Sequence, residues 1–233
     1  KPVIITGSLI PFADVYNDAR RNLIVSVLYA ARFDIPEVCI FFNNQLLRGN
    51  RASKVDTFGL SAFASPNFPP LGTLGTDLSL RQDLLLSPPK RRFRVFTKFD
   101  ENVAVLRLTP GFSDTVVRNL LQPPLRGIVL EMYGVGNAPA RRQGLMDVLA
   151  EAVKRGVVIV VISQCSRGFV NLSTYANGLA LRDHIGVVSG ADMTPEAAAT
   201  KLGYLLARGL ANDEIRTLLH TNIRGELSPS QST

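Results

Sequence analysis

Short apolar runs rich in Val and Ile alternate along the chain with longer amphipathic stretches. This alternation is typical of a parallel β-sheet covered by helices. It predicts strands over residues 3–6, 38–42, 103–108, 127–130, 157–162 and 185–188. We therefore expect an α/β fold, arranged as doubly wound domains with mostly parallel sheets.

Two of the longer stretches have a helical spacing of apolar positions. The helix predicted over residues 18–32 is expected to pack on a sheet through one side, made of Leu23, Ile24, Val27, Leu28, Ala30 and Ala31. Residues 141–155 repeat the pattern with Leu145, Val148, Leu149 and Ala152.

Helix-start signals are clearest near the end of the chain. Thr194 is predicted as an N-cap, with Pro195 at the first helical position, and the helix should run to about Arg208 and stop at Gly209. Asn212 is predicted to cap a last helix that extends through Leu219. The residues after Leu227 are polar and should fray.

The alternation of strands and helices breaks between residues 83 and 101. Residues 87–92 (SPPKRR) are typical of a solvated connector, which a short strand over 94–97 could follow. The pattern then restarts at Asn102. We therefore expect a first domain over residues 1–100, connector included, and a smaller α/β domain over 101–233.

Composition and charge exclude several classes of protein. The chain has 233 residues, 46% of them hydrophobic, and a formal net charge of +7. Its apolar runs, such as the six residues 157–162, are far shorter than the roughly 20 that a membrane-spanning helix needs. The basic residues form short clusters without a zinc-finger or RNA-recognition motif, which argues against a nucleic-acid partner. Cys39 and Cys165 share no metal-ligand spacing and are interpreted as free thiols of a reducing compartment.

Open α/β sheets bind ligands beyond the carboxyl ends of their strands, so the segments that follow the apolar runs are the candidate sites. Thr6-Gly7-Ser8 follows the first run, and Arg48-Gly49-Asn50-Arg51-Ala52-Ser53-Lys54 lies beyond the second. A glycine-containing turn, residues 133–139, and a small polar segment, residues 163–168, follow two later strands. Each of these can also be a plain turn or an exposed basic loop.

Familiar hydrolase motifs are absent from the sequence. It contains no G-x-S-x-G, H-E-x-x-H or P-loop motif, and His184 and His220 have no evident nucleophile partner and are interpreted as surface or cap residues. Lys54 is the strongest candidate for a general base, because burial or neighbouring cations lower a lysine pKa. Arg48 and Arg51 could supply that positive charge.

Several of these segments, taken together and in order, resemble the bacterial-type L-asparaginase family. The similarity is to its cytosolic type I branch and to the asparaginase domain of the animal 60 kDa lysophospholipase. The segments concerned are residues 1–8 (KPVIITGS), 41–43 (FFN) with 48–54 (RGNRASK), 63–67 (FASPN), 133–139 (YGVGNAP) and 189–194 (SGADMT).

This resemblance implies an activity, an assembly and a set of site residues. It implies hydrolysis of L-asparagine to L-aspartate and ammonia in the cytoplasm, without metal or organic cofactor, by a homodimer or homotetramer. Lys54 matches the family's catalytic lysine, which accepts a proton in a Thr-Lys-Asp triad. Ser8 and Asn137 match substrate-binding positions, and Ser53 and Asn137 match positions that could bind an effector.

Departures from the family pattern accompany the similarity. The family's glycine-rich threonine segment and its H-G-T-D-T segment both precede the region that starts at Lys1, so neither threonine nor the triad aspartate is in this sequence. We therefore expect an incomplete first domain and a chain that is inactive alone. Glu131 stands where the cytosolic bacterial branch has an arginine for allosteric asparagine binding, which puts that regulation in doubt.

Two other functions are compatible with the residues. The first is a non-catalytic α/β module that binds or senses an amino acid through the same strand ends. The second is the asparaginase-like subunit of a tRNA-dependent amidotransferase, for which the net charge of +7 is mildly favourable.

Overall fold

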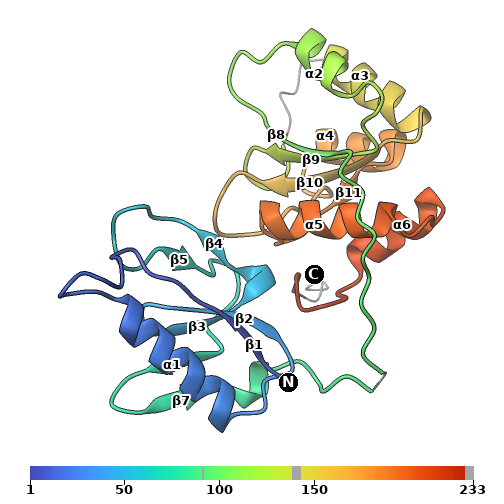
Figure 1. Cartoon of the computed structure of the whole chain (residues 1–233). Coiled ribbons are helices and arrows are strands. Elements are labelled where there is room, and N and C mark those ends of the chain that lie inside the picture. The colour runs from blue at the N-terminus through green and yellow to red at the C-terminus, as the bar shows by residue number, and fades with distance from the viewer. Residues whose placement is uncertain (91, 138–142, 229–233) are drawn as a thin grey trace. The chain divides into compact units, whose positions relative to one another are not determined.

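The computed structural model describes residues 1–90, 92–137 and 143–228 (Figure 1). They fall into two compact units, Lys1–Val95 and Phe96–Thr233, and each is described by itself. The first contains β1 (Val3–Ile5), α1 (Ala19–Arg32), β2 (Val38–Phe42), β3 (Gln45–Arg48), η1 (Gly49–Arg51), β4 (Ser53–Lys54), β5 (Phe63–Ala64), β6 (Gly72–Leu74), β7 (Leu78–Leu80) and η2 (Gln82–Leu84). The second contains β8 (Val103–Arg107), α2 (Asp114–Leu120), β9 (Gly127–Met132), α3 (Gln143–Lys154), β10 (Val158–Ser163), α4 (Ala176–Ala180), η3 (Leu181–Ile185), β11 (Val188–Ser189), α5 (Pro195–Leu206) and α6 (Asn212–His220).

The sheet of the second unit agrees with the sequence prediction. Its strand order is β11-β10-β9-β8, and all three neighbouring pairs are parallel. Helices α2 and α3 lie on one face of this sheet, and α5 and α6 lie on the other (Figure 1). Side chains of α2 and α3 share one buried cluster with the sheet, and side chains of α5 and α6 share another. Strands β9 and β10 are buried almost throughout because helices cover both faces.

The sheet of the first unit is mixed, which corrects the prediction of a mostly parallel sheet. Its order is β1-β2-β3-β6-β7, and only β1 and β2 are parallel. The cause is a two-residue turn between β2 and β3, in which Asn43 and Asn44 have φ of 42° and 70°. Positive φ at both central residues produces a tight antiparallel hairpin, so the chain returns immediately beside β2.

The buried face of α1 also differs from the predicted one. The helix packs through Asn22, Val25, Ser26 and Tyr29. Leu23, Ile24 and Val27, which the apolar spacing selected, are 50%, 52% and 58% exposed. Asn22 is buried because its side-chain amide donates to the Gly7 carbonyl oxygen at 2.9 Å. The periodicity of apolar residues does not reveal such a tertiary contact.

The segment between the units and the last helices give further comparisons with the predictions. No strand forms over residues 94–97, and Ile185 belongs to η3 rather than to a strand. The N-cap prediction is confirmed, since Thr194 Oγ1 accepts from the Ala197 amide at 3.2 Å, and Gly209 has φ of 69°. Asn212 is not a cap but the first residue of α6, and its Nδ2 donates to the Gly156 carbonyl at 3.1 Å.

Some predictions fall outside the described residues, namely the start of the helix predicted from 141, Arg91 of the connector and the tail beyond 228. Within the described ranges, none of the helices combines the length and the apolar character needed to cross a bilayer.

A buried ion pair joins the start of β2 to the end of β3. Arg48 Nε and Nη2 lie 2.5 and 3.0 Å from the two Glu37 carboxylate oxygens, and the side chains are only 5% and 2% exposed. The pair also binds backbone, because Arg48 Nη2 donates to the Leu84 carbonyl and the Leu86 amide donates to Glu37, both at 2.7 Å. The segment after β7 is thereby fixed to the sheet.

A second buried pair closes the end of the second unit. Lys201 Nζ on α5 lies 2.6 Å from Glu226 Oε1 and donates to the carbonyls of Leu219 and Thr221 at 3.0 and 2.6 Å. Burial lowers the pKa of Lys201. Burial also raises the pKa of Glu226, but the Lys201 ammonium and the amides of Ile223 and Arg224 lower it further, so its net shift is downward.

We expect Arg48→Met to lower the free energy of unfolding by about 3–5 kcal/mol, because it leaves the Glu37 carboxylate buried and uncompensated. Urea denaturation measures this loss. The matched control is Arg32→Met, since Arg32 forms an exposed pair with Asp77 at 3.7 Å, and its effect should stay below about 1 kcal/mol. Equal effects of the two substitutions would contradict a structural role for the Arg48 pair.

We expect Glu226→Gln to weaken the fold at neutral pH by about 3 kcal/mol and to reduce its sensitivity to acid. Because the folded-state pKa of Glu226 lies below its unfolded value, the carboxylate stabilises the fold above the unfolded value and stops doing so as the pH falls through the folded one. Thermal unfolding from pH 7 to pH 2 measures both effects. The exposed Glu214→Gln should retain the acid dependence of the original chain.

Candidate functional site

Lys54 lies on a small hairpin beside the first sheet. Strands β4 and β5 pair Ser53 with Ala64 and Lys54 with Phe63. The Lys54 side chain is exposed, and its Nζ lies 5.8 Å from the centroid of the Phe63 ring. That ring in turn contacts the buried Phe42 ring, with centroids 5.2 Å apart. The hairpin therefore presents an accessible amine on an aromatic support.

Arg48 and Arg51, which the sequence suggested as a source of positive charge near Lys54, are both buried. The charge of Arg48 is compensated by Glu37. Arg51 Nη2 donates to the Asn67 carbonyl at 3.0 Å, and the guanidinium carbons of Arg48 and Arg51 lie 4.3 and 5.3 Å from the centroid of Phe68. These arginines hold the loops on either side of the hairpin.

The loop that contains Ser8 is held from the start of α1. The Asp18 carboxylate accepts from the amides of Leu9 and Ile10 at 3.0–3.2 Å, and Asn22 binds the Gly7 carbonyl. Ser8 lies between these anchored residues and is exposed. A fixed backbone with an exposed small side chain suits close approach of a ligand.

Asn137 ends a tight turn in the second unit. The amides and carbonyls of Tyr133 and Asn137 bind one another at 3.2 and 2.8 Å, and Gly134 and Gly136 have φ of 51° and 103°. Asn137 Oδ1 is buried and has no hydrogen-bond partner among the described residues. Ala138 and Pro139, the last residues of the matched segment, lie outside those residues.

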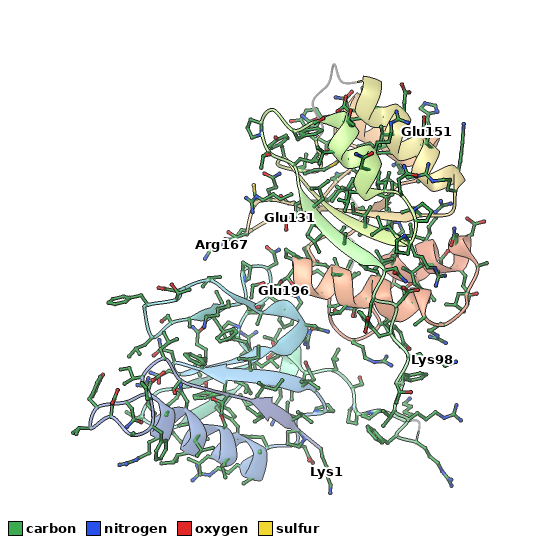
Figure 2. All side chains as sticks on the ribbon, turned by 45° about the horizontal axis from the view of Figure 1, so that its top comes forward. Lys1, Lys98, Glu131, Glu151, Arg167 and Glu196 are labelled. Carbon is green, nitrogen blue, oxygen red and sulfur yellow. The ribbon has the colours of Figure 1, made fainter. Side chains whose placement is uncertain are left out.

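Glu131, labelled in Figure 2, lies near the carboxyl end of β9 and is 9% exposed. Its Oε2 lies 3.3 Å from Arg107 Nη1 on the adjacent strand β8. Gln164 Nε2 donates to the Glu131 carbonyl at 2.8 Å. The negative charge at this position therefore has a positive partner within the same sheet.

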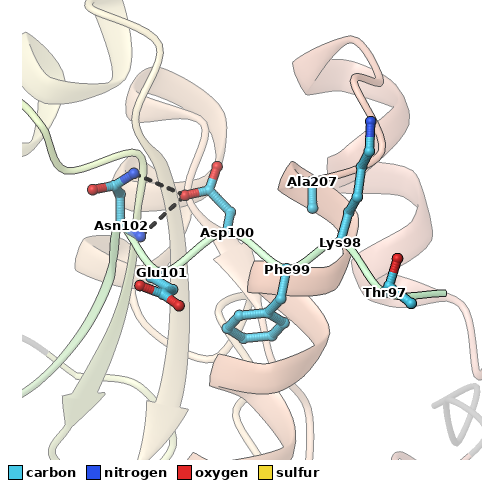
Figure 3. A pocket seen from close by; sticks show the side chains of 7 residues that line it. All are labelled: Thr97, Lys98, Phe99, Asp100, Glu101, Asn102 and Ala207. Carbon is cyan, nitrogen blue, oxygen red and sulfur yellow. Dashed lines mark hydrogen bonds between the residues drawn. The ribbon is translucent and has the colours of Figure 1, made fainter.

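A surface hollow of about 530 Å³ lies beside α5, lined by Thr97, Lys98, Phe99, Asp100, Glu101, Asn102 and Ala207 (Figure 3). Asp100 accepts from the backbone and side-chain nitrogens of Asn102 at 3.0 and 3.1 Å and pairs with Arg126. Burial raises the pKa of Asp100, but these donors lower it overall. The hollow contains none of the predicted site residues, and its most buried carboxylate is already engaged.

The histidines and the possible metal ligands provide no further candidate site within the described ranges. Both His184 and His220 are exposed, in agreement with the sequence interpretation. Over the described ranges, no group of three or more His, Cys, Asp or Glu side chains is placed to hold a metal ion.

The comparisons with known proteins cover both units. Residues 1–86 match the family model described as asparaginase, N-terminal, and residues 102–219 match the glutaminase/asparaginase C-terminal domain. The chain is 45% identical to L-asparaginase 1 of Escherichia coli K12 over 233 residues, which cover 98% of this chain and 67% of that protein. The chain belongs to the asparaginase family. The family prediction from the sequence is thus confirmed.

Two other relatives of this asparaginase-family chain are longer than the chain itself. It is 43% identical to the mouse 60 kDa lysophospholipase, over 98% of this chain but 40% of that protein. L-asparaginase I from Vibrio cholerae has the same fold, with a TM-score of 0.91 and 43% identity, over 98% of this chain and 68% of that one. The α/β fold class is confirmed, and the chain spans only part of each relative.

Sequence reasoning missed two features that support the asparaginase-family segments. The first is the Asn43-Asn44 turn, although two Asn residues between two apolar runs are a recognisable hairpin signal. The second is the anchoring of the Ser8 loop by Asp18 and Asn22, which lie 8 to 15 residues away from their backbone partners. No local pattern indicates such contacts.

We expect Gly136→Ala to destabilise the turn before Asn137 by about 1–3 kcal/mol. A Cβ at Gly136 would lie 2.8 Å from Val170 Cγ1 and 3.0 Å from Leu172 Cδ2, and the backbone φ is 103°. Urea denaturation measures the loss. Gly134→Asn is the control, because φ there is 51° and a Cβ would meet no atom of the described residues within 4 Å. Equal stability of the two variants would show that the turn accommodates a Cβ at Gly136 and would contradict the prediction.

Proposed function

We propose that this chain is part of an L-asparaginase that hydrolyses L-asparagine to L-aspartate and ammonia. The observation that carries the proposal is 45% identity to an enzyme named L-asparaginase 1 along 98% of this chain. Relatives named L-asparaginase also occur in Dirofilaria immitis, at 42% identity over 100% of this chain. The comparisons favour this function over an amino-acid-binding module and over an amidotransferase subunit.

The proposed chemistry is amide hydrolysis through a threonine nucleophile. A threonine oxygen attacks the side-chain amide carbon, backbone N–H groups stabilise the oxyanion, ammonia leaves, and water releases aspartate. Of the Thr-Lys-Asp triad, only Lys54 lies in this sequence. The Lys54 amine accepts the proton of the triad threonine, which is a second threonine beside the nucleophile. An exposed amine on the β4–β5 hairpin is compatible with that role.

The first unit supports the proposal that residues 1–100 are the remainder of a larger N-terminal domain. Val3, Ile5 and Val38 lie on the sheet face opposite α1 and are 51%, 55% and 52% exposed. Among the described residues, β1 pairs only with β2. Parallel strands are normally covered on both faces, so this face suits further chain of the same domain.

The finer assignments rest on the family resemblance. We place Ser8 and Asn137 in substrate binding, and Ser53 and Asn137 in binding of a possible effector. Asn137 Oδ1 is buried and has no hydrogen-bond partner within the described part of the chain, which supports a ligand contact there. We also propose a homodimer or homotetramer in the cytoplasm, as in the cytosolic branch, which needs no metal or organic cofactor.

We expect Lys54→Ala, made in the full-length protein, to lower the turnover of L-asparagine by about 10³-fold or more, because the proton acceptor is removed. Ammonia release measures turnover, and circular dichroism checks the fold. Since Lys54 is exposed, the melting temperature should not change.

Lys98→Ala removes another exposed lysine and should leave turnover unchanged. Near-normal turnover by Lys54→Ala would overturn the assignment of this residue.

A further inference from the structure

The hairpin that carries Lys54 depends on its neighbours for its position. It contains two residue pairs and forms a two-stranded sheet separate from the main one. A hairpin of this size is not stable by itself in water. Its contacts include the Phe42–Phe63 ring pair on one side and the Arg51–Asn67 hydrogen bond beyond its open end.

A third contact holds the closed end of the hairpin. Asn43, the first residue of the β2–β3 turn, donates from Nδ2 to Ser61 Oγ at 2.5 Å. Its Oδ1 accepts from Arg21 Nη2 on α1 at 3.1 Å. One amide group therefore joins the helix, the turn and the loop between β4 and β5.

The loop itself is internally bonded, so displacement at Ser61 would reach Lys54. The amides of Val55 and Asp56 donate to the Ala62 carbonyl at 2.8 and 3.4 Å. The Asp56 carboxylate accepts from the amides of Phe58 and Gly59 at 2.8 and 3.0 Å. These bonds connect the residue after Lys54 to the residue after Ser61.

We propose that Asn43 is a positioning residue for Lys54, acting through its hydrogen bond to Ser61. The inference rests on the proposed function. Asparagine suits the position in two ways. It tolerates the left-handed backbone, with φ of 42°, and its amide supplies an acceptor for Arg21 and a donor for Ser61 at once.

The test is made in the full-length protein with Asn43→Gly and Ser61→Ala. Glycine keeps the turn, so the melting temperature should change by no more than about 3 °C. Each variant should lower kcat for L-asparagine about tenfold, since a small displacement of a catalytic group has a large effect on rate, with KM changed less than about twofold. The double variant should lose no more than either single one.

Two further variants separate positioning from a general effect on the loop. Thr57→Ala alters an exposed residue of the same loop and should retain full kcat. Asn43→Asp keeps an acceptor for Arg21 and can accept from the Ser61 hydroxyl, so it should recover most of kcat. Amide exchange at Val55 and Asp56 should quicken in Asn43→Gly but not in Asn43→Asp.

The outcomes distinguish this inference from the function on which it rests. If Lys54→Ala is inactive while Asn43→Gly and Ser61→Ala retain full kcat, the positioning role is wrong and the proposed function stands. If Lys54→Ala is active, the proposed function of Lys54 is wrong, whatever the effect of Asn43. Additive losses of kcat in the double variant would also contradict the proposal that Asn43 and Ser61 act through one hydrogen bond.

Discussion

The first unit depends on the buried pair between Glu37 and Arg48. Two ions removed from water are tolerated only when each is matched in charge and hydrogen bonds, and here backbone groups of Leu84 and Leu86 complete the set. Directly after Arg48, a Cβ on Gly49 would lie 2.9 Å from the Val38 carbonyl, so the chain passes close against β2. The segment that leads to Lys54 therefore starts from a fixed position on the sheet.

Much of the second unit could be predicted from its sequence, and less of the first. Strands β9 and β10 read as continuous apolar runs because they are covered on both faces, and Thr194-Pro195 carries its own capping chemistry. In contrast, α1 is apolar on more than one side. The side that contains Asn22 is buried, because the Asn22 side-chain amide donates to the Gly7 carbonyl in a loop outside the helix.

The candidate site shows a similar division between local and tertiary information. The sequence suggests Arg48 and Arg51 as a source of positive charge for Lys54, yet both arginines are buried and bind Glu37 and the Asn67 carbonyl. A sequence does not distinguish an arginine inside a fold from one in a pocket. The residue types indicated Lys54 and the family resemblance gave it a role, whereas only the packing explains the two arginines that precede it.

The Lys201–Glu226 pair also has a consequence for how the chain can be shortened or extended. Glu226 and Leu227 are 4% and 5% exposed, and the Ser228 amide donates to Asp192 at 2.9 Å, so these residues belong to the interior of the second unit. A truncation before Glu226 would strip an interior ammonium of its counter-ion. Any shortened or tagged form of the chain therefore needs Glu226 for that ammonium to stay paired.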